Sequence, residues 1–338
     1  MMSQIGKGKD ETIIEPLQPI IDAHHHLFDR PPLTYLLKDY LEDARSGHNI
    51  IASVYVETQA FISHSGPEVM RPVGEVEFAN GVAAMSDSGV YGKIKVADGI
   101  VGYADLRFGE KIAPLLDTCL ERAGTRFKGV RQNIIDDKSP LPFKFVTNRP
   151  PHDLVNHPDF TKGLAEVEKR HLTFDIGAFH HQLLQIAKLA DTFPDLVIVL
   201  NNMGHVMALG LDEREKKEAL QTWRNNLREL AKRQNVVCKI GGLGLPFFGF
   251  NLHERKDVVT SKELVTLWRP YIETAIEAFG VERAMMESDY PMDGRSCGYV
   301  PLWNALKLCV SGASKEEKDN LFYKVAAKTY RINIEGLV

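Results

Sequence analysis

The sequence predicts an α/β fold, a single-domain (β/α)8 TIM barrel in which eight parallel strands close on themselves. Two observations support this fold class. Eight short apolar runs alternate strictly with helix-like segments along the 338 residues. The first of these runs is followed by histidines, whereas a doubly wound open sheet, the competing architecture, more often carries a glycine-rich phosphate-binding turn there. Because such barrels commonly exceed about 250 residues as one domain, the length does not require two domains.

The elements follow from hydrophobic periodicity. The strand-like runs are residues 20–23, 50–57, 99–104, 127–131, 172–178, 196–201, 236–241 and 283–288. The helical patterns between and after them are residues 74–86, 112–122, 160–169, 182–192, 213–234, 262–279, 301–310 and 315–330, and the first interval contains only a short segment at 35–43. We therefore expect a barrel domain of residues 19–338 with long loops after its strands, preceded by a flexible segment of residues 1–18.

The composition indicates an ordinary folded protein with a large core, because 44% of the residues are hydrophobic and 25% are charged. A net charge of -4 gives no reason to expect nucleic acid or an anionic membrane as a partner. The four cysteines are scattered and predict no disulfide framework. The N-terminus lacks the apolar core of a secretory signal, and no apolar run is long enough to span a membrane, so a cytoplasmic location is expected.

Three long loops are predicted at the carboxyl ends of the strands, where barrel enzymes place their active sites. They are residues 58–73, 132–157 and 242–261. Loops of this length in a compact domain are more often functional than decorative. The third loop contains an aromatic stretch at residues 244–250, and its Phe248 is expected to close over an apolar ring of the substrate.

The strongest local signal is the histidine run that ends the first strand. Successive side chains of an extended segment point to opposite sides, so His24 and His26 face one way and His25 faces the other. Two imidazoles that converge at a barrel mouth form half of a metal site or a pair of proton-transfer groups.

Polar residues at other strand ends complete the predicted site. His180 follows the fifth strand-like run, and Asp289 follows the eighth in a position that suits a metal ligand or a general base. An arginine at the mouth, Arg107 or Arg131, is expected to bind a substrate carboxylate, although a rim salt bridge is equally consistent with either. Glu57, at the end of the second run, is a further candidate for substrate binding.

Taken in order, these motifs resemble the amidohydrolase superfamily, specifically the amidohydrolase-2 group of TIM-barrel hydrolases that includes lactonases. The resemblance extends from Ile20 to about Tyr330. The motifs that carry it are Asp22-Ala23-His24-His25-His26-Leu27-Phe28-Asp29, Phe127-Lys128-Gly129-Val130-Arg131, Phe179-His180-His181-Gln182-Leu183, Val199-Leu200-Asn201-Asn202-Met203-Gly204, Lys239-Ile240-Gly241-Gly242 and Glu287-Ser288-Asp289-Tyr290-Pro291.

The resemblance implies a ligand set of His24, His26, His180 and Asp289 that holds one divalent metal, with Zn²⁺ as the expected ion, or that works without metal as in some lactonases. The bridging carboxylated lysine of two-metal members has no clear counterpart after the fourth strand-like run, so the resemblance implies one metal at most. The implied reaction is hydrolysis of a lactone or related cyclic ester, with a small carboxylated or aromatic-derived ring as substrate. A non-oxidative decarboxylase on the same scaffold is the alternative. The substrate itself stays undetermined, and a homo-oligomer is possible.

One departure from the family pattern follows the sixth strand-like run. Asn202 occupies the position where the group usually has a histidine, and an amide cannot take up a proton or carry positive charge. Asn202 is therefore expected to polarise a carbonyl, and His205, three residues on, is the candidate substitute for proton transfer. The same departure leaves open a protein that binds or rearranges its ligand without attack by water.

Overall fold

The computed structural model describes residues 11–338 and confirms the predicted barrel. Eight strands form one sheet whose order follows the chain, and each neighbouring pair within it is parallel. The strands are β1 (Pro19–His25), β4 (Asn49–Val56), β5 (Lys95–Tyr103), β6 (Phe127–Arg131), β7 (Thr173–Ile176), β8 (Ile198–Leu200), β9 (Val236–Ile240) and β10 (Ala284–Met286). Each of the eight predicted runs is matched by one of them.

The barrel closes between β1 and β10 through backbone contacts at their carboxyl ends. The amide of His26 donates to the carbonyl of Tyr290 at 2.8 Å, and the amide of Asp289 donates to the carbonyl of His24 at 2.9 Å. This closure joins the two segments that carry the predicted metal ligands, although they are far apart in the sequence.

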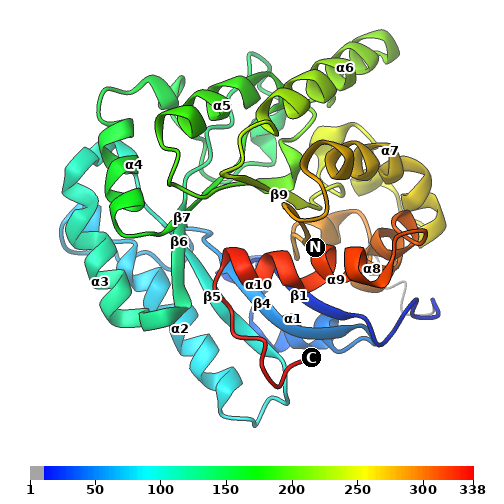
Figure 1. Ribbon diagram of the computed structural model, residues 1–338, viewed down its shortest axis with the longest axis horizontal. Coiled ribbons are helices and arrows are strands. Elements are labelled where there is room, and N and C mark those ends of the chain that lie inside the picture. Colours follow the sequence, from blue (N-terminus) through cyan, green and yellow to red (C-terminus); the bar gives the residue numbers. More distant parts are fainter. Residues whose placement is uncertain (1–10) are drawn as a thin grey trace.

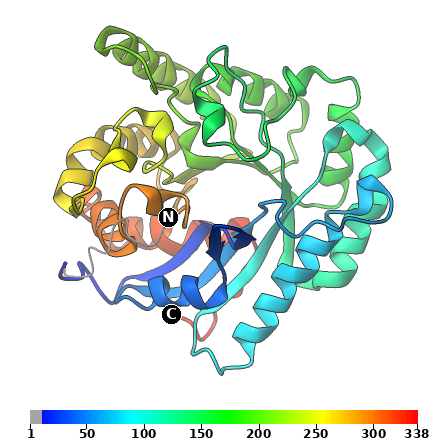
Figure 2. The same ribbon diagram turned by 180° about the vertical axis from the view of Figure 1, so that it is seen from behind.

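Helices surround the sheet (Figure 1). They are α1 (Leu37–Ala44), α2 (Val73–Asp87), α3 (Ala113–Ala123), α4 (Phe160–Lys169), α5 (Leu183–Thr192), α6 (Glu213–Leu230), α7 (Ser261–Phe279), α8 (Tyr299–Cys309), α9 (Lys315–Asp319) and α10 (Val325–Thr329). The predicted last helix at 315–330 is divided, because a π-helical turn at Asn320–Lys324 separates α9 from α10. A small hairpin of β2 (Phe28–Arg30) and β3 (Leu33–Tyr35), which the apolar pattern did not predict, lies at the mouth, seen from behind in Figure 2.

Helix ends are set by local sequence, and one helix also positions a site loop. Asp212 caps α6 by accepting hydrogen bonds from the amides of Arg214 and Glu215, while Glu215 accepts a bond from the Asp212 amide in return. From the buried face of α6, Trp223 donates its indole N–H to the carbonyl of Met203 at 2.8 Å. This bond holds the loop that follows β8.

The end of the barrel opposite the mouth is covered by the C-terminal segment that contains α10 (Figure 1). Tyr330 reaches inward and donates to Asp175 at 2.8 Å, and the Lys239 ammonium lies 2.8 Å from the same carboxylate oxygen. Asp175 and Lys239 are both fully buried, and each compensates the charge of the other inside the barrel.

The described part of the predicted flexible N-terminal segment is held against the barrel. The Ile14 amide donates to Asn304 at 2.9 Å, and Lys307 donates to the carbonyls of Ile14 and Glu15 at 2.9 Å each. Residues 1–10 of that segment lie outside the described residues. Within residues 11–338, no helix has both the length and the apolar character needed to cross a bilayer.

Candidate active site

The histidine run after β1 has the alternating arrangement that its extended backbone predicts. His25 faces outward, where its ring stacks on Tyr40 at 4.1 Å between centroids and its Nε2 lies 3.0 Å from Ser53 Oγ. His24 and His26 face inward, with their Nε2 atoms 3.2 Å apart. The outward ring therefore packs a helix against the barrel, and the inward pair is left for chemistry.

Hydrogen-bond partners determine which nitrogen carries the proton in each inward ring. His26 Nδ1 lies 2.8 Å from the carbonyl of Val56, which can only accept, so Nδ1 donates and Nε2 is an acceptor. The guanidinium of Arg131, which can only donate, lies 3.2 Å from His24 Nε2. His24 Nε2 is therefore also an acceptor, and His24 donates from Nδ1 to Glu287 Oε2 at 2.7 Å.

Three acceptor atoms consequently converge at one point. Asp289 Oδ1 lies 3.6 Å from His24 Nε2 and 3.4 Å from His26 Nε2, and the ligand atoms of the three residues all lie within 4.8 Å of one another. Acceptors at this spacing repel unless a cation lies between them, and such an ion would take the His24 Nε2 lone pair that accepts from Arg131 in this structure. Two imidazole nitrogens and one carboxylate oxygen, each imidazole oriented by a bond from its other nitrogen, fit a divalent ion such as Zn²⁺. Burial lowers the pKa of His24 well below its ordinary value, which keeps the ring in the neutral form that a metal requires.

Glu287 connects His24 to the loop after β8, although the sequence predicted no role for it. Besides accepting from His24, it accepts the backbone N–H of Asn202 at 3.1 Å. Its carboxylate is fully buried, which raises its pKa well above the ordinary value. A signal was present in the sequence, because Glu287 is an acidic residue within the apolar run 283–288 that precedes Asp289.

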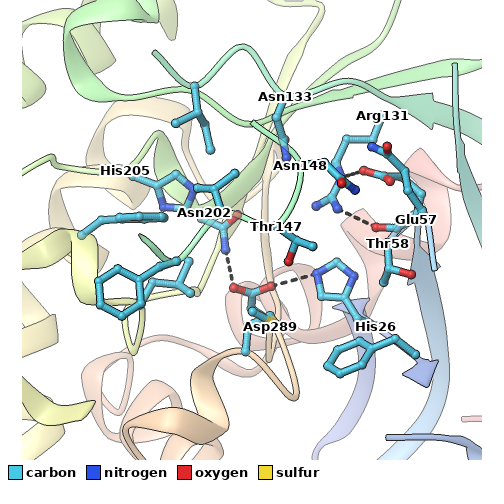
Figure 3. Close-up of a pocket in the computed structure, with 18 of the residues that line it drawn as sticks. His26, Glu57, Thr58, Arg131, Asn133, Thr147, Asn148, Asn202, His205 and Asp289 are labelled. Atoms are coloured by element: carbon cyan, nitrogen blue, oxygen red, sulfur yellow. Dashed lines mark hydrogen bonds and ion pairs between the residues drawn. The ribbon is translucent and has the colours of Figure 1, made fainter. Parts of the chain in front are cut away.

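Asn202 contacts the predicted site as an orienting group. Its Nδ2 donates to Asp289 Oδ2 at 3.1 Å, which leaves Oδ1 directed at His24 and His26. Figure 3 shows Asp289 between Asn202 and His26. Both residues have left-handed backbone conformations, with φ of 52° for Asn202 and 50° for Asp289. Asn and Asp tolerate this region better than most residues, so the local conformation suits the residue types present.

The glycine that faces Asn202 provides a test of this packing. A Cβ on Gly242 would lie 1.8 Å from Asn202 Nδ2, and its φ is +65°. We expect Gly242→Ala to displace Asn202, to lower turnover at least tenfold, and to lower the free energy of unfolding by more than the ~1 kcal/mol cost of a left-handed alanine. Turnover assays and urea unfolding measure the two effects.

Gly280 offers a matched control, because its φ is +71° and nothing lies within 4 Å of the position that a Cβ would take there. Gly280→Ala should lose only the backbone contribution to stability and keep full turnover. Equal turnover in the two variants would contradict the assigned role of the Gly242 contact.

The convergent residues lie at one side of a cavity of about 140 Å³ that opens at the mouth. All three predicted long loops contribute to it. The lining residues are His26, Phe28, Arg30, Glu57, Thr58, Gln59, Arg131, Asn133, Ile135, Phe145, Val146, Thr147, Asn148, Asn202, His205, Leu245, Phe247, Asp289 and Met292. In Figure 3, Arg131, Asn133 and Asn148 lie on one side, and Asn202 and His205 lie on the other.

Glu57 and Arg131, which were predicted to bind the substrate, both line the cavity and form an ion pair with each other. Arg131 Nε donates to Glu57 Oε1 at 2.7 Å, and Nη2 donates to the Glu57 carbonyl at 2.6 Å. His205 also lines the cavity, with a buried Nδ1 that has no hydrogen-bond partner within residues 11–338. Burial lowers the pKa of His205 to about 4, so the ring is neutral at pH 7.

Three predicted residues lie elsewhere. His180 belongs neither to the cavity lining nor to the metal-ligand group of the described residues. Its Nδ1 accepts a hydrogen bond from the Met207 amide at 3.1 Å. Arg107 pairs with its neighbour Asp105 at 2.5 Å on the surface. Phe248 packs against Tyr271, with ring centroids 5.4 Å apart, and Phe247 faces the cavity in its place.

Known proteins resemble this chain in sequence and in fold. The amidohydrolase family model matches residues 21–332. An uncharacterized protein, y4mH of Sinorhizobium fredii, is 32% identical over 93% of this chain and 98% of its own length. The L-fucono-1,5-lactonase of Burkholderia multivorans is 25% identical over 69% of this chain and 71% of its own. A crystal structure of a Burkholderia multivorans amidohydrolase with bound zinc superposes with a TM-score of 0.67, at 23% identity over 93% of this chain and 99% of that one.

The family match covers nearly the whole barrel, including every strand that supplies a residue to the site. The relative y4mH matches over almost its full length as well. The chain therefore belongs to the amidohydrolase family.

Proposed function

We propose that this protein is a hydrolase that opens a lactone or related cyclic ester by attack of water at the barrel mouth. The observation that carries the proposal is the convergence of His24 Nε2, His26 Nε2 and Asp289 Oδ1 beside the cavity. The similarity to a lactonase over about two thirds of the chain supports this reaction class.

His24, His26 and Asp289 would hold one divalent metal, as the donor set and the acceptor geometry favour. Such an ion supplies Lewis acidity, which polarises a carbonyl and lowers the pKa of water. Glu287 and the Val56 carbonyl would keep both imidazoles in the ligating tautomer. His180 is not assigned as a metal ligand.

The proton transfers are assigned to residues that line the cavity. Asp289 accepts the proton of the attacking water and returns it to the leaving alkoxide, and Asn202 keeps its carboxylate oriented. The Arg131 guanidinium beside His24 stabilises the negative charge that develops on the carbonyl oxygen. His205, neutral at pH 7, donates a hydrogen bond to the leaving oxygen.

Metal content tests the first part of this proposal. We expect protein purified without chelator to contain about one equivalent of a divalent metal, because one acceptor cluster is present among the described residues. Chelation should abolish turnover, and Zn²⁺ should restore it. Elemental analysis of the parent and of His180→Ala is the measurement, and the variant should retain its metal. Loss of metal from His180→Ala would return this residue to the ligand set.

The reaction class is tested separately with a panel of lactones and aromatic carboxylates. Ring opening consumes one equivalent of base, whereas a decarboxylase on the same scaffold releases CO₂. Ring opening without CO₂ release is expected. CO₂ release alone would establish the decarboxylase, and saturable binding without either product would establish a non-hydrolytic protein.

A further inference from the structure

Arg30, on the β2–β3 hairpin, lines the cavity, and neither the sequence motifs nor the proposed reaction uses it. We propose that Arg30 recognises a carboxylate on the substrate, so that selectivity for carboxylated rings depends on this residue. The inference rests on the proposed ring-opening site and names the substrate class that the site accepts.

Arg30 differs from the other acidic and basic side chains of the cavity in its interaction partners. Four side chains of the Asp, Glu, Lys and Arg types line the cavity: Arg30, Glu57, Arg131 and Asp289. Arg131 and Glu57 neutralise each other at 2.7 Å. Asp289 faces the two histidines and accepts from Asn202. Within residues 11–338, no carboxylate forms an ion pair with Arg30, so its positive charge is left uncompensated inside the cavity.

Arg30 is nevertheless held in place by a neutral partner. Its Nη2 donates to the carbonyl of Thr58. Thr58 is itself fixed, because the fully buried Glu75 accepts its amide at 2.8 Å and its hydroxyl at 2.7 Å. A carbonyl oxygen orients the guanidinium without cancelling its charge. Part of the entropy cost of ordering a long side chain is therefore met before a ligand binds.

The remaining N–H groups of Arg30 match the geometry of a carboxylate. A guanidinium presents donors in a planar fork that binds two carboxylate oxygens together. The two arginines that the sequence predicted for this task already have such partners, since Arg107 is paired with Asp105 and Arg131 with Glu57. Arg30 lines the cavity and has no carboxylate partner among the described residues, so its guanidinium is available to bind the substrate.

Paired substrates test the assignment. The probes are a γ-lactone that bears a ring carboxylate and the corresponding primary carboxamide, which has the same shape without the charge. We expect Arg30→Gln to lower kcat/KM for the carboxylate about 10- to 100-fold, mainly through KM, and to leave the carboxamide unchanged. Arg30→Lys should recover part of the loss. Arg107→Gln is the matched control and should change neither substrate.

A binding measurement separates this inference from the proposed function. Calorimetry with benzoate and benzamide requires no turnover. The parent protein should bind benzoate more tightly than benzamide, and the Arg30→Gln variant should bind the two equally. If no lactone is hydrolysed but the preference for benzoate depends on Arg30, carboxylate recognition by Arg30 is supported and the ring-opening proposal is contradicted. Equal binding of benzoate and benzamide by the parent, or equal losses on both lactones in Arg30→Gln, would overturn the assignment.

Discussion

Replacing His26 with alanine is expected to abolish turnover, by at least ~10³-fold, and to remove the bound metal. The change deletes one of three converging acceptor atoms, and the two left would hold an ion poorly. The barrel should survive, because the structural cost is one hydrogen bond to the Val56 carbonyl, worth about 1 kcal/mol. Turnover, elemental analysis and urea unfolding of the same preparation measure the three quantities.

The neighbouring His25 supplies the control for this experiment. It lies on the opposite side of the strand, stacked on Tyr40 and bonded to Ser53. His25→Ala should therefore show the reverse pattern, with lower stability and retained metal. Full turnover of His26→Ala would remove the proposed site from consideration.

The second large effect is expected from His205. Its neutral imidazole lines the cavity and has no partner for Nδ1 within the described chain. Loss of a donor that acts in the transition state typically lowers the rate about 10²–10³-fold. We expect a decrease of that size in kcat for His205→Ala, with KM changed little. Steady-state kinetics on the best lactone of the panel provides the measurement.

Asn202→His is the companion variant, and it should be neutral or harmful. A histidine would restore the usual family residue, but Asn202 already holds Asp289 and packs tightly on Gly242. A larger ring has little room there, and it would give up the bond that orients the carboxylate. Faster turnover in Asn202→His together with an unaffected His205→Ala would show that His205 does not replace the missing histidine.

Much of the fold was readable from the sequence, because it depends on local periodicity. Each barrel strand is a short apolar run, and each helix is a longer periodic segment, so both kinds of element are encoded by near neighbours in the chain. The same reasoning placed His24 and His26 on the inner side of β1 and His25 on the outer side. Asp289, three residues past the end of β10, lies beside the inward pair because its amide donates to the carbonyl of His24 at 2.9 Å.

Side-chain positions in the irregular loops did not follow from local sequence patterns. His180 lies four residues beyond the end of β7, and the intervening turn carries it away from the metal-ligand group of the described residues. In the loop after β9, Phe247 rather than Phe248 lines the cavity. A single residue of register reverses which side chain faces inward, and no local pattern sets that register in an irregular loop.

The sequence by itself determined the barrel, the inward histidine pair and the loops that surround the mouth. Only the tertiary structure decided which polar groups meet: Glu287 with His24, Arg131 with Glu57, and Arg30 with no carboxylate of the described chain. These pairings join strands and loops far apart in the sequence, and they arise when β1 closes against β10 and the loops pack above them. Electrostatic interactions depend on separation in space, which a one-dimensional pattern does not contain.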